Sequence, residues 1–496
     1  MPCLMSFSFL RAVGLLLFGG LLAAPATAQS WQTLSLPGAG SSGTLTVLAS
    51  AFSPAGPQAG EVIVAGTFTG TVVLGSSTLT SAGGLDIFVA RLTQGGGWIR
   101  AVRAGGPDAD QATGLAVTVS PNHDVIVCGQ FAGPVLTLGP TTLTNTTPGT
   151  TDVFVGRLNA ALDWLGGAQL SGAGDDFATG VGISNAGAIT VVGSFRSATL
   201  QAGALPMTNA GVGTHDAFVA RYAVGGTWDQ AVRVGGSGDE LAGAVDVTIF
   251  GEAVVAGSFA SPAVSFGATA LTNAEPAGQE ADAFVARLSP AGQWTQAVRA
   301  GAVGGDYLRA VRFDNAGGVV VAGDFTGATT AFGPTTLANA DASGNSSDLL
   351  VARLSAGGTW TQATGAGSAG LDYATGLALD GLGGAVVVGS FYGPSLPLGG
   401  ATLTNAVPGA ASFDVFVGRL SPAGAWTQAT RAGEPPTTTP RPLPWTRGAV
   451  PTWAGWCPAR ARSSARSPCP PVRPPRATWR RWAGCQLLSA RRRGRS

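Results

Sequence analysis

The chain has 496 residues, enough for one large all-β domain or two ordinary domains, and its formal net charge is +1. That sum hides a division, because residues 29–433 carry 14 Arg against 26 acidic residues, whereas residues 434–496 carry 13 Arg and one Glu. The acidic body argues against a nucleic-acid partner. Its one cysteine, Cys128, excludes an internal disulfide there, and its place in "VIVCG" predicts a buried apolar residue in a strand.

Residues 1–28 are typical of a secretory signal peptide. Arg11 precedes the apolar run "AVGLLLFGGLLAA", and Ala26-Thr27-Ala28 fits the small-x-small cleavage pattern, so the mature chain is expected to begin at Gln29. An uncleaved N-terminal anchor is the alternative. No later run of 18 apolar residues follows, so we expect a secreted or cell-surface protein with no membrane span after signal removal.

Residues 29–433 contain an internal repeat of about 66 residues. Its clearest phrase is "DIFVARL" or a close variant, which begins at Asp86, Asp152, Asp216, Asp282, Asp348 and Asp414. A tryptophan follows 12 residues after each of these aspartates, at Trp98, Trp164, Trp228, Trp294, Trp360 and Trp426. A glycine also closes a β-branched run in every unit, as Gly389 does in "AVVVGSF".

Each unit predicts four short strands. In the last complete unit these are "GLALD", "AVVVGSF", "DVFVGRL" and "AWTQATRAG", with a long arm ending in "ATLTNA" between the second and third. A sheet this small cannot bury both faces alone, so we predict an all-β fold, a β-propeller in which each blade covers its neighbour. A solenoid is the alternative. The recurring tryptophan is then expected to pack between blades rather than bind a ligand.

The phrases "DAFVARLSPAGQWTQAVRAG" and "DYATGLALDGLGGAVVVGSF" resemble the repeat of bacterial seven-bladed β-propeller proteins known as SBBP-repeat proteins. The resemblance covers about residues 46–433 and repeats six times in the same order. The arm before each third strand is longer than the family pattern. The resemblance implies an exported seven-bladed propeller, and it implies no defined activity.

Both ends of the chain bear on how the propeller closes. Trp31-Gln32-Thr33 resembles the start of a fourth strand, so we expect the N-terminus to close the last blade, and "TLTVLASAF" predicts a first strand. Residues 29–433 would then be a propeller of six repeats plus this closing strand.

The Arg/Pro-rich segment at residues 434–496 keeps the phase of the repeat when it is read in a shifted frame. Because Trp has one codon, Trp445-Thr446 yields Asp in that frame, and Asp380 lies 66 positions before residue 446. In the same way Trp453-Ala454 yields Gly, and Ala454-Gly455 yields Gly or Arg at position 455, 66 positions after Gly389. We therefore predict a seventh blade lost to a frameshift, with the segment as written disordered. The alternative is a real basic tail that binds nucleic acid or an anionic surface.

Acidic residues recur in the link between each fourth strand and the next first strand, at Asp110, Asp176, Glu240, Asp306 and Asp372. Phe177, Tyr307 and Tyr373 follow three of them, and the arms on the same face end at Asn145, Asn209, Asn273, Asn339 and Asn405. One interpretation is structural, with acids and asparagines capping turns. The other is a site for a polar ligand or a cation, for which the oxygen donors favour calcium; no other cofactor is expected.

Two classes of function remain open. The favoured one is a monomeric binding or scaffold module for a surface glycan or protein, because one acid per blade is a symmetric pattern, whereas an active site breaks symmetry. The alternative is an extracellular polysaccharide-active enzyme that uses loop-face carboxylates, which would have to lie in close pairs. The Asp of each "DxFVARL" phrase is expected to pair with the Arg of that phrase or to cap the arm.

Overall fold

A computed structural model of the chain describes residues 41–52, 60–118, 123–145, 147, 149–276, 280–341, 343, 346–407 and 412–433. The chain divides into two units, Met1–Val450 and Pro451–Ser496, and all described residues belong to the first. The predictions for the signal peptide, for the closing strand at Trp31–Thr33 and for residues 434–496 lie outside the described residues.

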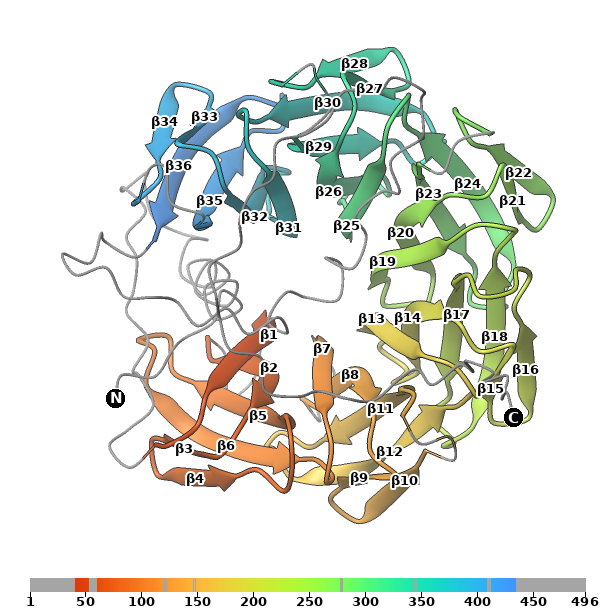
Figure 1. Cartoon of the computed structure of the whole chain (residues 1–496), viewed down its shortest axis with the longest axis vertical. Coiled ribbons are helices and arrows are strands. Elements are labelled where there is room, and N and C mark those ends of the chain that lie inside the picture. Colours follow the sequence, from red (N-terminus) through yellow and green to blue (C-terminus); the bar gives the residue numbers. More distant parts are fainter. Residues whose placement is uncertain are drawn as a thin grey trace, which may run out of the picture. The chain divides into compact units, whose positions relative to one another are not determined.

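The described part forms a β-propeller of six four-stranded antiparallel blades that follow one another in chain order (Figure 1). Blade 1 consists of β1 (Leu45–Phe52), β2 (Val62–Phe68), β5 (Asp86–Leu92) and β6 (Trp98–Ala104). Blade 2 consists of β7 (Asp110–Val117), β8 (Val125–Phe131), β11 (Asp152–Leu158) and β12 (Trp164–Leu170). Blade 3 consists of β13 (Asp176–Ile183), β14 (Ile189–Phe195), β17 (Asp216–Tyr222) and β18 (Trp228–Val234). Blade 4 consists of β19 (Glu240–Val247), β20 (Ala253–Phe259), β23 (Asp282–Leu288) and β24 (Trp294–Ala300). Blade 5 consists of β25 (Asp306–Phe313), β26 (Val319–Phe325), β29 (Asp348–Leu354) and β30 (Trp360–Ala366). Blade 6 consists of β31 (Asp372–Leu379), β32 (Ala385–Phe391), β35 (Asp414–Leu420) and β36 (Trp426–Ala432).

The structure adds one element to the predicted blade. Each long arm, predicted only as a connection, folds into a two-stranded hairpin outside the four-stranded sheet. These hairpins are β3 (Thr71–Leu74) with β4 (Ser77–Thr80), β9 (Val135–Leu138) with β10 (Thr141–Thr144), β15 (Thr199–Ala202) with β16 (Leu205–Thr208), β21 (Ala263–Phe266) with β22 (Thr269–Thr272), β27 (Thr329–Phe332) with β28 (Thr335–Ala338), and β33 (Ser395–Leu398) with β34 (Ala401–Thr404). Their strands alternate buried and more exposed residues as strands do, but each has only four residues, so the arm could be mistaken for a loop.

The glycine that closes each β-branched run has a steric reason. In blade 6 a Cβ built on Gly389 would lie 1.8 Å from the carbonyl oxygen of Tyr373 in the neighbouring first strand. The register between these two strands shifts between Ala374 and Gly376, next to that contact. The first strand can therefore bulge against the second only where the second has no side chain.

Apolar residues of successive blades share common cores. The core between blades 5 and 6, for example, combines Leu349 and Val351 with Leu377, Val387 and Phe391. Equivalent cores join the other four pairs of successive blades. This arrangement confirms that each sheet covers its neighbour.

Among the described residues, two clusters belong to a single blade. One lies in blade 1 and includes Phe68 and Phe88, and the other, in blade 6, is formed by Val386, Val388 and Val417. Blades 1 and 6 therefore each present one face whose described core comes from that blade alone.

The recurring tryptophan packs between blades, as predicted. The indole Nε1 of Trp164 donates a hydrogen bond to the carbonyl oxygen of Arg103 in the preceding blade (3.0 Å), and Trp360 donates to that of Arg299 (3.1 Å). Trp360 is 5% exposed and meets Phe332 edge-on at 4.9 Å between ring centroids. Cys128 is fully buried in β8, also as predicted, and the described residues include no helix able to cross a membrane.

Candidate functional site

The five recurring acids lie between blades and are buried. Each is the first residue of a first strand rather than part of a link, and none is more than 2% exposed. The backbone N–H of each acid donates a hydrogen bond to a carbonyl oxygen of the preceding blade, at 2.7–2.9 Å. That carbonyl belongs to the residue just before the third-strand aspartate. We call this meeting point a seam; the seam pairs are Asp86 with Asp110, Asp152 with Asp176, Asp216 with Glu240, Asp282 with Asp306, and Asp348 with Asp372.

The structure therefore places the acids in separate seams, each beside the third-strand aspartate of the preceding blade. In the seam between blades 4 and 5, a Cβ built on Gly301 would lie 2.5 Å from Oδ1 of Asp282 and 2.6 Å from Oδ2 of Asp306. The two carboxylates thus close around one glycine. Gly235 and Gly367 stand at the same place in other seams, where a Cβ would lie 2.1 Å and 2.0 Å from a carboxyl carbon. Glycine is needed here because the carboxylate occupies the position of the side chain.

The third-strand aspartate caps its arm, as one of the two alternatives predicted. Oδ2 of Asp216, for example, accepts a hydrogen bond from the Ala210 amide at 2.8 Å. The other alternative was wrong, because its ion-pair partner is the fourth-strand Arg233, at 2.6 Å. The arginine of the "DxFVARL" phrase lies toward the other end of its strand, where Arg91 pairs with Glu61 at 3.2 Å.

Burial changes the acidity of the seam. Loss of hydration, which backbone and hydroxyl hydrogen bonds only partly offset, raises the pKa of Asp110, Asp176 and Glu240 to about 7. The neighbouring third-strand carboxylate raises the pKa further in each case. These seams therefore hold protons at a pH where exposed carboxyl groups have lost them.

The recurring asparagines have the structural role that the first interpretation gave them. Oδ1 of Asn145 accepts a hydrogen bond from the Thr147 amide (2.8 Å), and its Nδ2 donates to the carbonyl oxygen of Thr150. Oδ1 of Asn209, Asn273, Asn339 and Asn405 likewise accepts from the amide two residues later. They form Asx-turns that shape the arms.

Blades 5 and 6 contain the clearest departure from the repeat. The fourth position of the first strand is a small or hydroxyl residue in four blades, namely Thr113, Thr179, Gly243 and Thr375. In β25 of blade 5 the same position is Arg309. At the next-to-last position of the second strand the other blades carry Thr, Gln or Ser, whereas β26 carries Asp324. Arg309 and Asp324 form a bidentate ion pair, in which Nε of Arg309 donates to Oδ1 of Asp324 and Nη2 donates to Oδ2. The Nη2–Oδ2 distance is 3.1 Å. Sequence reasoning missed this pair, although aligning the repeats would have revealed both charges.

Aromatic side chains surround the ion pair. The guanidinium of Arg309 lies 5.8 Å from the ring centroid of Tyr307 and 5.5 Å from that of Tyr373. Tyr373 stacks on Phe413 at 6.1 Å, and Phe413 meets Tyr392 at 5.2 Å. We call Tyr307, Arg309, Asp324, Tyr373, Tyr392 and Phe413 the aromatic–arginine cluster.

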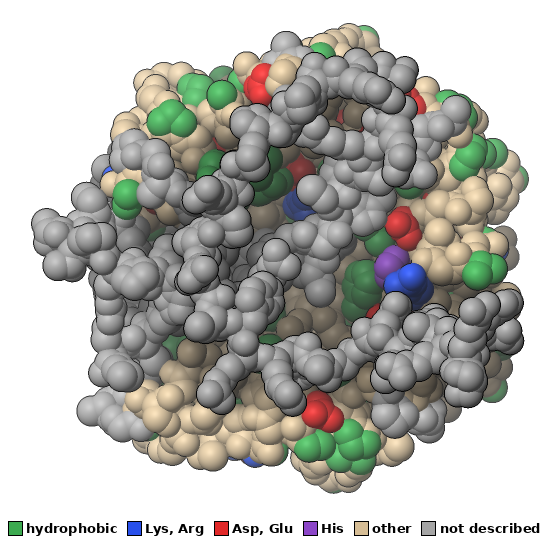
Figure 2. Space-filling model, in the orientation of Figure 1, with side chains coloured by type: hydrophobic (Ala, Val, Ile, Leu, Met, Phe, Trp, Pro, Cys, Tyr) green, Lys and Arg blue, Asp and Glu red, His purple; other side chains and the backbone are tan. Residues whose placement is uncertain are grey.

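The cluster is accessible in part. Tyr392 is 37% exposed and the Arg309 side chain 23%, whereas Asp324 is buried. Burial raises the pKa of both Tyr307 and Tyr373, so their phenols stay protonated at neutral pH. Charged side chains of both signs lie beside apolar ones near the middle of the face seen in Figure 2. The cluster combines apolar faces, hydrogen-bond donors and one charge pair.

Phe177, the third aromatic that follows a recurring acid, lies away from this cluster. Its ring is 5.6 Å from that of His215, and Nδ1 of His215 lies 3.1 Å from Oδ1 of Asp239. Across the described ranges, no three His, Cys, Asp or Glu side chains gather in a way that could hold a metal ion.

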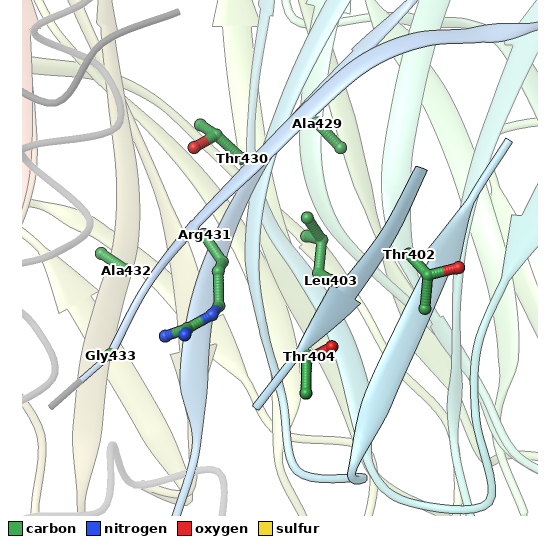
Figure 3. Close-up of a pocket in the computed structure, with 8 residues that line it drawn as sticks. All are labelled: Thr402, Leu403, Thr404, Ala429, Thr430, Arg431, Ala432 and Gly433. Atoms are coloured by element: carbon green, nitrogen blue, oxygen red, sulfur yellow. The ribbon is translucent and has the colours of Figure 1, made fainter. Parts of the chain in front are cut away.

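A cavity of about 560 Å³ lies on the outer face of blade 6, between β34 and β36 (Figure 3). It is lined by Thr402, Leu403, Thr404 and residues 429–433. Arg431 and Gly433 occupy the positions that Arg299 and Gly301 have in blade 4. There the arginine carbonyl accepts from Trp360, and the Gly301 amide donates to the Ala331 carbonyl of blade 5 at 3.0 Å. The cavity thus lies where a further blade would pack.

Comparisons with known proteins assign neither a family nor an activity to the chain. No protein-family model matches the sequence, and no curated protein matches it. Among solved structures, the crystal structure of Sqt1 from Chaetomium thermophilum is similar at 10% identity with a TM-score of 0.35, over 77% of this chain and 86% of that chain. A similarity this weak carries no argument about what the protein binds.

The seam carboxyls predict an unusual dependence of stability on pH. Because folding raises the pKa of Asp110, Asp176 and Glu240 to about 7, the folded state binds more protons than the unfolded state between roughly pH 4 and pH 7. The stabilisation is complete at acidic pH and is lost as the pH rises through 7. We expect the free energy of unfolding to fall between pH 5 and pH 8, by about 1 kcal/mol or more for each such carboxyl.

Thermal melts at pH 5, 6, 7 and 8 in a metal chelator would measure this fall. Asp110→Asn, which keeps a neutral side chain in the seam at every pH, is expected to reduce it. A melting temperature that rises from pH 5 to pH 8 would show that the seam carboxyls are ionised throughout.

Proposed function

We propose that the propeller is an exported binding or scaffold module that holds a glycan or protein ligand at the aromatic–arginine cluster. The observation that carries this proposal is the departure from the repeat at Arg309 and Asp324, flanked by Tyr307 and Tyr373. Ligand sites typically combine aromatic walls with a few fixed polar groups. Such a set suits a sugar, whose apolar face can lie on a tyrosine while its hydroxyls bond to charged groups.

A binding role is favoured over the enzymatic alternative because of where the carboxylates lie. Hydrolysis of a glycosidic bond needs two carboxyl groups that flank the bond. The closely paired carboxylates described above belong to the seams, and none of the first-strand acids is more than 2% exposed. We therefore propose a module without catalytic activity, secreted or at the cell surface. The order of its repeat motifs supports a place among SBBP-repeat proteins.

We also propose a seventh blade between blades 6 and 1, encoded by the shifted frame after Gly433. Two observations support it: the clusters at the ends of the described propeller belong to one blade each, and the cavity of blade 6 presents Arg431 and Gly433 where other blades receive a neighbour. The phase of Trp445-Thr446 with Asp380 adds independent support from the sequence.

Glycan binding can be tested with a pair of matched variants. We expect a glycan array to identify an oligosaccharide that binds the protein, and Tyr373→Ala to weaken its affinity about tenfold or more, as expected for loss of a central aromatic contact. Phe177→Ala is the control, because Phe177 has the same position in β13 but lies outside the cluster. Equal losses in the two variants, or binding that Tyr373→Ala leaves unchanged, would contradict the proposed site.

The seventh blade can be tested by restoring the frame. An expression clone with one base corrected after codon 433 should give a protein that melts at a higher temperature and stays monomeric, because the open faces of blades 1 and 6 become covered. An independent genomic clone should show the corrected frame. An unbroken frame identical to the present one in that clone would overturn the proposal.

A further inference from the structure

The seams differ in how their negative charge is balanced. In blades 1, 3, 4 and 6 a fourth-strand arginine pairs with the third-strand aspartate, as Arg103, Arg233, Arg299 and Arg431 do. In blades 2 and 5 this position holds Gln169 and Gly365. The carboxylates of those two seams are buried without that arginine, and burying like charges without a cation is costly.

In the seam between blades 5 and 6, oxygen atoms of both carboxylates lack partners. Asp348 is 2% exposed and its Oδ2 accepts from the Ala340 amide, whereas its Oδ1 has no hydrogen-bond partner. Asp372 is fully buried, and its Oδ2 accepts from the amide and hydroxyl of Ser368 while its Oδ1 also has none.

The backbone brings the two carboxylates to one place. The Asp372 amide donates to the Ser347 carbonyl at 2.8 Å, and residues 347 and 371 form a parallel bridge. Asp348 and Asp372 therefore follow neighbouring positions on two adjacent chain segments. A Cβ built on Gly367 would lie 2.0 Å from Oδ1 of Asp348, and the next residue, Ser368, bonds to Asp372.

The other seam without arginine is better satisfied. Asp176 accepts hydrogen bonds on both oxygens, from the Arg196 and Ser197 amides and from the Ser197 hydroxyl at 2.6 Å. Only Oδ2 of Asp152 remains without a partner there. The seam between blades 5 and 6 is thus the one with unpartnered oxygens from both carboxylates and no arginine.

We propose that this seam binds a divalent metal cation of the calcium class, held by Asp348 and Asp372. Carboxylate oxygens are hard donors, which calcium prefers, and backbone carbonyls and water commonly complete its shell. The cation takes the place of the guanidinium that balances other blades. The proposal does not depend on the aromatic–arginine cluster being a ligand site.

The test supplies the missing guanidinium. Gly365→Arg places an arginine where blade 4 has Arg299, and a Cβ at this position meets no atom closer than 3.6 Å, so the variant is expected to fold. After treatment with EDTA, the parent protein should bind one Ca²⁺ per chain in equilibrium dialysis, with a dissociation constant of about 10⁻⁴–10⁻³ M as in extracellular modules. Gly365→Arg should abolish this binding.

Matched variants separate charge from shape. Gly365→Ala should bind Ca²⁺ as the parent does, because it adds a side chain without a charge. Asp372→Asn should weaken binding at least tenfold, whereas Asp414→Asn, at the third-strand position that Arg431 already balances, should leave the stoichiometry unchanged. Circular dichroism and melting curves would check that every variant is folded.

Three results would overturn the proposal. The first is a parent protein that binds no Ca²⁺ and melts at the same temperature with EDTA and with excess Ca²⁺, which would indicate a proton shared by the two carboxyls. The second is Ca²⁺ binding that persists unchanged in Gly365→Arg. The third is equal loss of binding in Gly365→Ala and Gly365→Arg.

Discussion

Each blade is joined to the next at a seam, where one backbone hydrogen bond lies beside two buried carboxyl groups. The bond runs from the amide of a first-strand acid, such as Asp306, to the carbonyl preceding the third strand of the blade before, and it repeats five times at 2.7–2.9 Å. The crowding of carboxylates explains why Gly235, Gly301 and Gly367 carry no side chain. Apolar cores and the tryptophan hydrogen bond then extend the same contact outward.

A repeated seam makes departures from the repeat informative. Residues that recur around the propeller, such as the arm asparagines of blades 2 to 6 and the tryptophan of every blade, are accounted for by turns and packing. The residues that turns and packing do not explain lie in blades 5 and 6. They are the Arg309–Asp324 pair with its tyrosines, and the seam in which Gly365 replaces arginine. Any function specific to this propeller is therefore expected there.

The sequence predicted the fold well because the repeat shows the same strand pattern six times. The third strands begin at the predicted aspartates, and Trp360 packs between blades as expected. The role of the acids was harder to predict, since a polar residue after a glycine-rich link reads as exposed. Only the three-dimensional arrangement shows that Asp372 starts a strand and is buried against the preceding blade.

The candidate site was predicted in part. Tyr307 and Tyr373 were named from their spacing, but Arg309 and Asp324 were not, because their contact joins two strands whose register is not visible in one unit. The arm hairpins were missed because their strands have only four residues each, which is too short for their alternation to stand out from a loop. Short strands of this kind resemble loops until the blade that covers them is considered.

Native-state hydrogen exchange, followed peptide by peptide, tests the central claim that the seams hold the propeller together. The amides of Asp110, Asp176, Glu240, Asp306 and Asp372 each donate across a seam, so we predict that they exchange only through the largest openings, as slowly as the second and third strands do. Hairpin-turn amides such as Gly187 and Gly251, whose hydrogen bonds stay within one turn, should exchange much faster. Seam amides that exchange as fast as these turn amides would contradict the account.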